Sequence, residues 1–79
     1  MSDYKAMNNG NQGIIAALSE REVEVIQLMA QGKINKEIAR ELFIAEPTVK
    51  THVARISQKF SASNRTDIVA RSFRAGIVS

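Results

Sequence analysis

The chain has 79 residues, 44% of them hydrophobic and 24% charged, a composition that predicts one small folded domain rather than a disordered chain. It has no cysteine and a single histidine, which excludes disulfides and thiolate metal sites, and we expect no metal and no cofactor. No apolar run approaches the roughly 20 residues of a membrane span, and the first residues lack the pattern of a signal peptide, so a cytoplasmic location is expected.

Charge is distributed unevenly along the chain. Residues 1–46 carry five basic and seven acidic side chains, a net −2, whereas residues 47–79 carry six basic and one acidic, a net +5. A basic C-terminal half indicates an anionic partner, but a surface kept soluble by charge gives the same balance. From charge alone the two interpretations are equally open.

The polar residues 1–13 are expected to form a flexible N-terminal arm, and residues 14–79 a single domain. The first helix of the domain is predicted to begin at Ser19, because Ser19 and Glu22 have the S-x-x-E spacing of a capping box. Gly32 is a natural stop for this helix. Its buried face is marked by an apolar stripe: Val25, Ile26, Leu28 and Met29.

A break near residues 43–45 separates two further helices. The shorter one is predicted to be capped by Asn35, and the longer one to start near Glu46, because Pro47 fits only the first turn of a helix. The small side chain of Ala39 lets two helices cross closely, and its spacing from the break is that of a helix-turn-helix. The apolar stripe of the longer helix is Val49, Val53, Ile56 and Phe60.

A final helix is predicted from near Arg65, capped by Ser63 or Asn64, to Gly76. No window alternates as a strand does, so the fold class is all-α, with four helices. The inner face of the last helix is expected to be Ile68, Val69, Ser72 and Phe73.

The outward face of the 46–60 helix carries the functional prediction. Turning its apolar stripe inward directs outward a set with no acidic member: Lys50, Thr51, Ala54, Arg55 and Gln58. A helix fits the major groove of DNA, where Lys and Arg donate to guanine acceptors, and Ala and the Thr methyl group contact the thymine methyl. We therefore predict base contacts by Lys50, Thr51, Ala54 and Arg55.

Phosphate contacts are expected around this face, where they would set register and salt dependence. Thr48 offers a hydroxyl and nearby free amides, and His52 is interpreted as a half-packed histidine that touches phosphate rather than as a catalytic base. The full predicted phosphate-binding set is Asn35, Lys36, Thr48, His52, Lys59 and Arg65.

Motifs in order along residues 18–78 resemble the LuxR/NarL/FixJ family of bacterial DNA-binding domains. They are Leu18-Ser19 with Arg21-Glu22, Gly32, Asn35 to Ala39, Thr48-Val49-Lys50 with His52, Ile56 with Lys59-Phe60, Asn64-Arg65, and Gly76-Ile77. The resemblance implies a four-helix helix-turn-helix domain whose third helix enters the major groove. It also implies that the fourth helix pairs two copies on a two-fold operator, which here would use Ile68, Val69, Ser72 and Phe73.

Several positions depart from the family pattern, among them Val23, where a basic residue is usual, and Ala54, whose methyl group offers no hydrogen bond to a base. Ala45 stands where a Ser or Thr cap is usual, which removes a cap worth about 1 kcal/mol. Ser72 replaces a small apolar residue, a change that bears on any dimer built on that helix.

The expected function is sequence-specific binding of double-stranded DNA in bacterial transcription regulation. The alternative is a module like region four of sigma factors, which docks on RNA polymerase or another protein. An enzyme is not expected, since the chain offers no cysteine nucleophile and no second histidine. No pattern in the sequence encodes the operator, the input signal or the direction of regulation.

Overall fold

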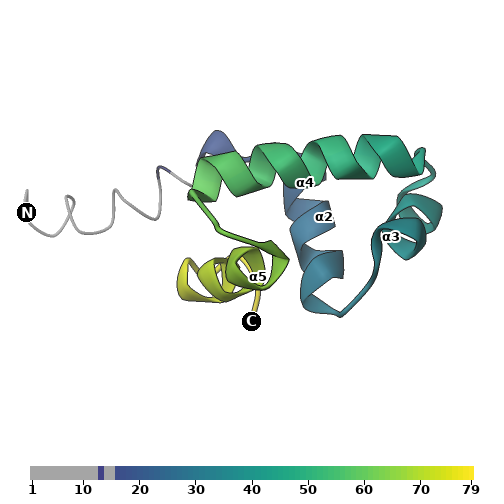
Figure 1. Cartoon of the computed structure of the whole chain (residues 1–79). Helices are drawn as coiled ribbons and strands as arrows, with labels where there is room; N and C mark the ends of the chain where they lie inside the picture. The colour runs from purple at the N-terminus through teal and green to yellow at the C-terminus, as the bar shows by residue number, and fades with distance from the viewer. Residues whose placement is uncertain (1–12, 14–15) are drawn as a thin grey trace, which may run out of the picture.

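A computed structural model of the chain describes residue 13 and residues 16–79, and in this part of the chain there are helices but no strand (Figure 1). The helices are α2 (Glu20–Ala30), α3 (Asn35–Leu42), α4 (Glu46–Phe60) and α5 (Arg65–Arg74). The predicted all-α class and its four helices are confirmed. The predicted arm, residues 1–13, lies outside the described residues except for Gly13.

The capping box predicted at the start of α2 is present. The Ser19 hydroxyl accepts from the Glu22 amide at 3.1 Å, and the Ser19 amide donates to Glu22 Oε1 at 2.8 Å. Both bonds satisfy amides that an uncapped helix leaves without a partner. Gly32 follows α2 with φ +85°, the left-handed conformation that glycine adopts without strain, so the chain turns here towards α3.

The predicted cap of α3 was wrong by one residue. Ile34 occupies the cap position and Asn35 is the first helical residue. The Ile34 amide donates to Glu37 Oε1 at 2.9 Å, so Glu37 makes the hydrogen bond that closes this helix start. α3 ends at Leu42, and the next residue, Phe43, is in the left-handed region at φ 57° and is 94% exposed. Because Glu37 and not Asn35 makes the cap hydrogen bond, the Asn35 side chain can bond to another partner.

The ends of α4 and α5 follow the sequence signals more closely. Pro47 lies in the first turn of α4, and Ala45, at the cap position, makes no side-chain cap. Asn64 caps α5, because its Oδ1 accepts from the Asp67 amide at 2.8 Å. The missing cap on α4 and the present cap on α5 were both expected.

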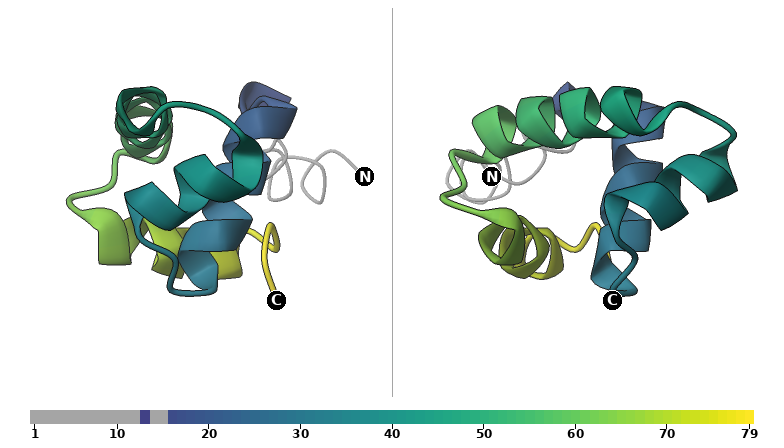
Figure 2. Two further views of the ribbon diagram at one scale, coloured as in Figure 1. Left: turned by 90° about the vertical axis from the view of Figure 1, so that its right-hand side faces the viewer. Right: turned by 45° about the vertical axis from the view of Figure 1, so that its right-hand side comes forward.

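α4 runs along one side of the molecule, with α3 at its N-terminal end, α5 below its C-terminal end and α2 between them (Figure 1, Figure 2). α2 and α4 each pack against all three other helices, whereas α3 and α5 do not pack against one another. The C-terminus lies on the side away from α4 (Figure 1). Among the described helices, none covers the outer flank of α4.

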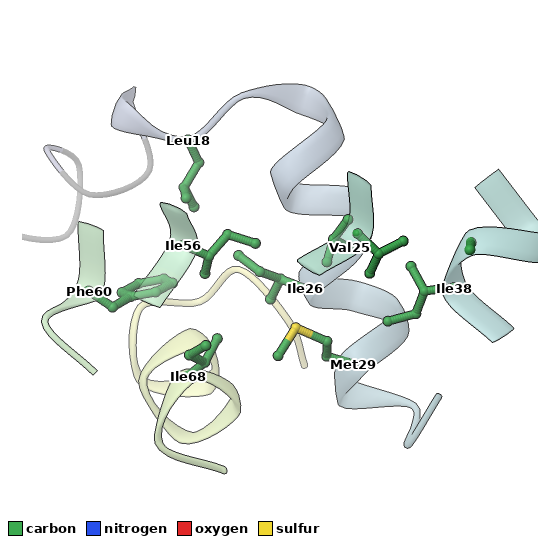
Figure 3. Close-up of a cluster of buried hydrophobic side chains, with 10 residues drawn as sticks. Leu18, Val25, Ile26, Met29, Ile38, Ile56, Phe60 and Ile68 are labelled. Atoms are coloured by element: carbon green, nitrogen blue, oxygen red, sulfur yellow. The ribbon is translucent and has the colours of Figure 1, made fainter. Parts of the chain in front are cut away.

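The core lies between α2 and α4, which pack against α5 on one side and against Ile38 and Ala39 of α3 on the other. Figure 3 shows Ile56 and Phe60 of α4 and Ile68 of α5 gathered around the α2 side chains. Val49, Ile56 and Phe60 are buried and Val53 packs against them, so the predicted stripe of α4 is confirmed. Burial of such a side chain stabilises the fold by about 1.5–3 kcal/mol.

The predicted inner face of α5 was only partly right. Ile68 and Ser72 are buried, and Val69 is half-buried against the core, but Phe73 is 48% exposed. The Ser72 hydroxyl donates to the Ile68 carbonyl at 2.7 Å, which satisfies a polar group inside an apolar core. Phe73 follows Ser72 directly, and the 100° step between the two residues carries its ring out of the core.

Candidate nucleic-acid interface

The side chains predicted to face outward from α4 do so. Lys50, Thr51, Ala54 and Arg55 are all exposed, as is Gln58. They are exposed because the opposite side of the same helix is held in the core by Val49, Ile56 and Phe60. α4 thus presents a mixed cationic and polar surface that none of the other described helices covers. We call Lys50, Thr51, Ala54, Arg55 and Gln58 the open face of α4.

The two cations of the open face have no carboxylate partner within the described part of the chain. The ion pairs found there are Arg21–Glu24, Lys33–Glu41, Lys59–Glu22 and Arg71–Asp67, and neither Lys50 nor Arg55 takes part in one. Uncompensated positive charge on a helix face attracts an anionic ligand and needs no internal pair to be broken before binding.

Thr51 is turned by a bond to its own helix. Its hydroxyl donates to the Pro47 carbonyl at 3.1 Å. With its hydrogen used in this way, Thr51 offers an acceptor oxygen and a methyl group to a ligand rather than a donor. It is therefore suited to an apolar contact such as the methyl group of thymine.

The start of α4 is a poorer anion site than its sequence suggested. The Thr48 amide donates to the Ala45 carbonyl at 3.0 Å, and Pro47 has no amide hydrogen. Of the free amides expected in the first turn of α4, those of Pro47 and Thr48 are therefore not available to an anion. Thr48 is exposed, and its hydroxyl is the group that can still reach a phosphate.

His52 lies on the edge of the open face. It is half-buried, and its Nδ1 is the one side-chain atom among the described residues that is buried without a hydrogen-bond partner. An unpaired ring nitrogen on the buried side fits the expectation of a histidine packed along one edge. Contact of its outer edge with phosphate remains a prediction.

The Lys59 ammonium group forms hydrogen bonds within the protein. Its Nζ donates to the Ala17 carbonyl at 2.6 Å and to Glu22 Oε1 at 2.7 Å. Burial of Glu22 acts to raise its pKa, but the bonds from Lys59 and Ser19 and the Lys59 charge outweigh it, so the pKa lies below the ordinary value. Lys59 thus joins the end of α4 to the start of α2, a role that its position near the basic end of the chain did not reveal.

Arg65 is also engaged inside the molecule. Its Nη1 donates to Asn35 Oδ1 and its Nη2 to the Lys33 carbonyl, both at 2.7 Å. Partial burial lowers the pKa of the guanidinium, which stays charged at neutral pH. Of the cations predicted to bind phosphate, Lys36 is the one that is exposed and has no ion pair in the described chain.

Arg40 was missed by the sequence reasoning. It is exposed, lies four residues after Lys36 on α3 and makes no ion pair with any described residue. Side chains four apart share a helix face, so Arg40 extends the positive surface that Lys36 begins. The i, i+4 spacing was the available signal.

The surface that α5 can offer to a partner is smaller than predicted. Ile68 and Ser72 lie in the core of the domain, which leaves half-buried Val69 and exposed Phe73. Phe73 borders an open pocket of about 330 Å³ between the ends of α2 and α5, lined also by Gln27, Ala30, Gln31 and residues 76–79. An apolar ring beside a pocket can pack against another protein surface.

Metal-binding and membrane-spanning features do not occur in the described part of the chain. Residues 13 and 16–79 contain no group of three or more metal-ligating side chains placed to hold an ion. Within those residues, none of the helices has both the length and the apolar character needed to cross a bilayer.

Comparison with known proteins matches residues 16–72 to the family described as bacterial regulatory proteins, luxR family. The chain is 53% identical over 60 residues to the uncharacterized transcriptional regulatory protein YxjL of Bacillus subtilis (strain 168), covering 76% of this chain and 28% of that protein. It is 44% identical over 59 residues to the spore germination protein GerE of the same organism, covering 75% of this chain and 80% of GerE.

A solved structure of the transcription factor GerE superimposes on this fold with a TM-score of 0.75 at 34% identity, covering 78% of this chain and 92% of that one. The chain therefore spans most of GerE, but little more than a quarter of the length of YxjL.

Proposed function

The chain belongs to the luxR family of bacterial regulatory proteins, a family of DNA-binding transcription regulators, and we propose that it binds double-stranded DNA sequence-specifically with α4 in the major groove. The observation that carries this proposal is the open face of α4, where Lys50 and Arg55 are exposed, unpaired with any described carboxylate and flanked by Thr51 and Ala54.

Each of these four side chains has a defined chemistry for a base edge. Lys50 and Arg55 donate to the O6 and N7 acceptors of guanine, and Arg55 can do so with two parallel bonds. Ala54 and the Thr51 methyl group supply apolar contact, since the Thr51 hydroxyl hydrogen is used by Pro47. The readout we propose is therefore two donor positions and two methyl-recognising positions.

Phosphate contacts are proposed for Asn35, Lys36, Thr48 and His52. Lys36 supplies charge from the exposed side of α3, and Thr48 and His52 lie on α4 beside the open face. Lys59 and Arg65 are not included, because their charged groups are already bound to Glu22, Asn35 and main-chain oxygens. Arg40 joins the proposed set by its spacing from Lys36.

The test begins with selection of bound fragments from random duplexes, which gives the preferred half-site. Lys50→Ala should then weaken binding to that site by about 1–3 kcal/mol while changing binding to unrelated duplexes far less. Lys33→Ala is the control, because it removes an equal charge from a residue paired with Glu41, and it should leave the ratio of specific to non-specific affinity unchanged. Equal loss on all sequences would make Lys50 a phosphate contact.

The docking alternative separates from DNA binding in the same assay. A DNA-binding chain shows log affinity that falls steeply with log salt, because binding releases counterions from the duplex and this release is less favourable at high salt. Retention on RNA polymerase with no retention of any duplex would instead favour the sigma-like docking function.

We also propose that two copies pair through α5 on DNA, using Val69 and Phe73. Support comes from the half-exposed ring of Phe73 beside its pocket. Phe73→Glu should abolish cooperative binding to two half-sites, while binding to one half-site and the circular dichroism of the fold persist. Undiminished cooperativity in this variant would exclude the Phe73 surface as the dimer contact.

A chain whose ligand is chromosomal DNA works in the bacterial cytoplasm, and we propose that location. We propose no enzymatic activity and no cofactor, because every side chain that the site uses serves binding.

A further inference from the structure

A planar fork of hydrogen bonds joins two helices that do not otherwise pack together. α3 and α5 have no helix-to-helix contact, yet Arg65, the first residue of α5, reaches the start of α3. One guanidinium nitrogen donates to Asn35 Oδ1 and the other to the Lys33 carbonyl, each at 2.7 Å. The two acceptors are two residues apart at the entry to α3, so the fork fixes the position of that entry.

The chemistry of arginine fixes the orientation of the Asn35 amide as well. A guanidinium has donors and no acceptor, so the Asn35 atom that faces it must be the carbonyl oxygen. The amide NH₂ group is then the other branch of the side chain. It has no hydrogen-bond partner among the described residues, and it is not one of the buried unpaired atoms, so solvent reaches it.

Asn35 is also released from the role that its sequence position suggests. The α3 cap is made by Glu37, which accepts from the Ile34 amide at 2.9 Å. Asn35 therefore contributes nothing to closing its own helix and points its donor group outward. Its neighbour is Lys36, the exposed cation of the same helix start.

We propose that Arg65 is a positioning residue for DNA binding: it holds the Asn35 carbonyl oxygen so that the Asn35 NH₂ group donates to a backbone phosphate beside Lys36. This assignment rests on the proposed function and adds to it how one phosphate contact is built. In this proposal Arg65 does not contact the nucleic acid, because its guanidinium donates to Asn35 Oδ1 and to the Lys33 carbonyl. The fork makes the start of α5 a support for the start of α3.

The first test is a double-mutant cycle with Arg65→Ala and Asn35→Ala, using fluorescence anisotropy on a random-sequence duplex. Each single change should weaken binding about tenfold, the loss expected for one hydrogen bond to a charged group. The double variant should bind no more weakly than the weaker single variant, because Arg65 acts through Asn35. Additive losses would overturn the proposal.

Salt dependence gives a second readout, one that does not depend on how well Arg65→Ala folds. The slope of log affinity against log salt should be the same for Arg65→Lys as for the unaltered chain, and for Arg65→Gln as well. A cation that neutralises a phosphate contributes about 0.9 to this slope. A slope reduced by about that amount in Arg65→Gln, and restored in Arg65→Lys, would make Arg65 a direct contact and refute the positioning role.

Asn35→Asp separates folding from binding. The carboxylate keeps an acceptor for Arg65, so the melting temperature should not fall, but it replaces the outward NH₂ group with an oxygen that repels phosphate. Affinity for the duplex should drop by about tenfold or more relative to Gln27→Glu, a control with the same charge change on an exposed position of α2. Equal affinity of the two variants would overturn the proposal, whereas an unaltered chain that binds no duplex would overturn the proposed function itself.

Discussion

Replacement of Lys59 by Met should destabilise the fold but leave the salt dependence of DNA binding unchanged. The change removes the two hydrogen bonds of Nζ, to Ala17 and to Glu22, while keeping most of the aliphatic stem. Loss of one partner from a fully buried pair costs about 3–5 kcal/mol. The loss is smaller here, because the Lys59 side chain is 33% exposed and the Glu22 carboxylate still accepts from the Ser19 amide after the change.

We therefore expect a loss of about 2–3 kcal/mol, which for a domain of this size lowers the melting temperature by roughly 10–20 °C. Thermal unfolding at pH 7, followed by circular dichroism, measures this directly. Adding Glu22→Gln to Lys59→Met should recover part of the loss, because a neutral amide tolerates burial better than an unpaired carboxylate. A melting temperature unchanged in Lys59→Met, together with a salt slope smaller by about 0.9, would make Lys59 a phosphate contact instead.

Two further predictions concern the helix starts. Ala45→Ser should raise stability by about 1 kcal/mol, because Ala45 has the extended cap conformation (φ −74°, ψ 149°) and no side-chain acceptor. A Ser hydroxyl there could accept from the Thr48 amide, which now bonds only to the Ala45 carbonyl that it shares with the Val49 amide. Ala54→Ser on the exposed side of α4 is the control and should give no comparable gain in thermal unfolding. Because the pKa of Glu22 is lowered on folding, its contribution is complete above its ordinary value of 4.5 and is lost as pH falls through the folded value. The difference in melting temperature between the unaltered chain and Glu22→Gln should thus be constant near neutral pH and shrink below about pH 4.5; a difference independent of pH down to strong acid would contradict this.

Local patterns accounted for most of the fold. The Ser19–Glu22 box, Pro47 and the Asn64 cap each act within one helical turn, so their residue spacing specifies their geometry. The same holds for the open face of α4, since a helix with Val49 and Ile56 in the core must turn Lys50 and Arg55 outward. These features needed no knowledge of tertiary packing.

The partners of the long cations could not be predicted in this way. Lys59 and Glu22 are 37 residues apart in sequence, and Arg65 and Asn35 are 30 apart, so only the packed fold brings them together. A basic residue near a predicted interface has the same sequence signature whether it faces a phosphate or a buried carboxylate. Lys59 and Arg65 were assigned to phosphate for this reason.

Phe73 and Asn35 illustrate a finer limit. A step of one residue along a helix changes the direction of a side chain by 100°, which separates buried Ser72 from exposed Phe73. In the same way, an error of one residue in the start of α3 assigned the cap to Asn35 instead of Ile34. Boundaries of helices and edges of apolar faces are therefore the places where sequence patterns are least decisive.

α4 is both a helix that packs against every other helix and the helix that carries the open face. Its outward side chains consequently stand on a rigid platform that exists before any duplex arrives, and no segment of α4 has to order itself on contact. We therefore expect DNA binding through α4 to need no folding of that helix, and to show only the heat-capacity change that comes from dehydration of the two joined surfaces. If the open face binds DNA as proposed, we expect the entropy lost by α4 to come mainly from the side-chain rotations of Lys50, Thr51 and Arg55.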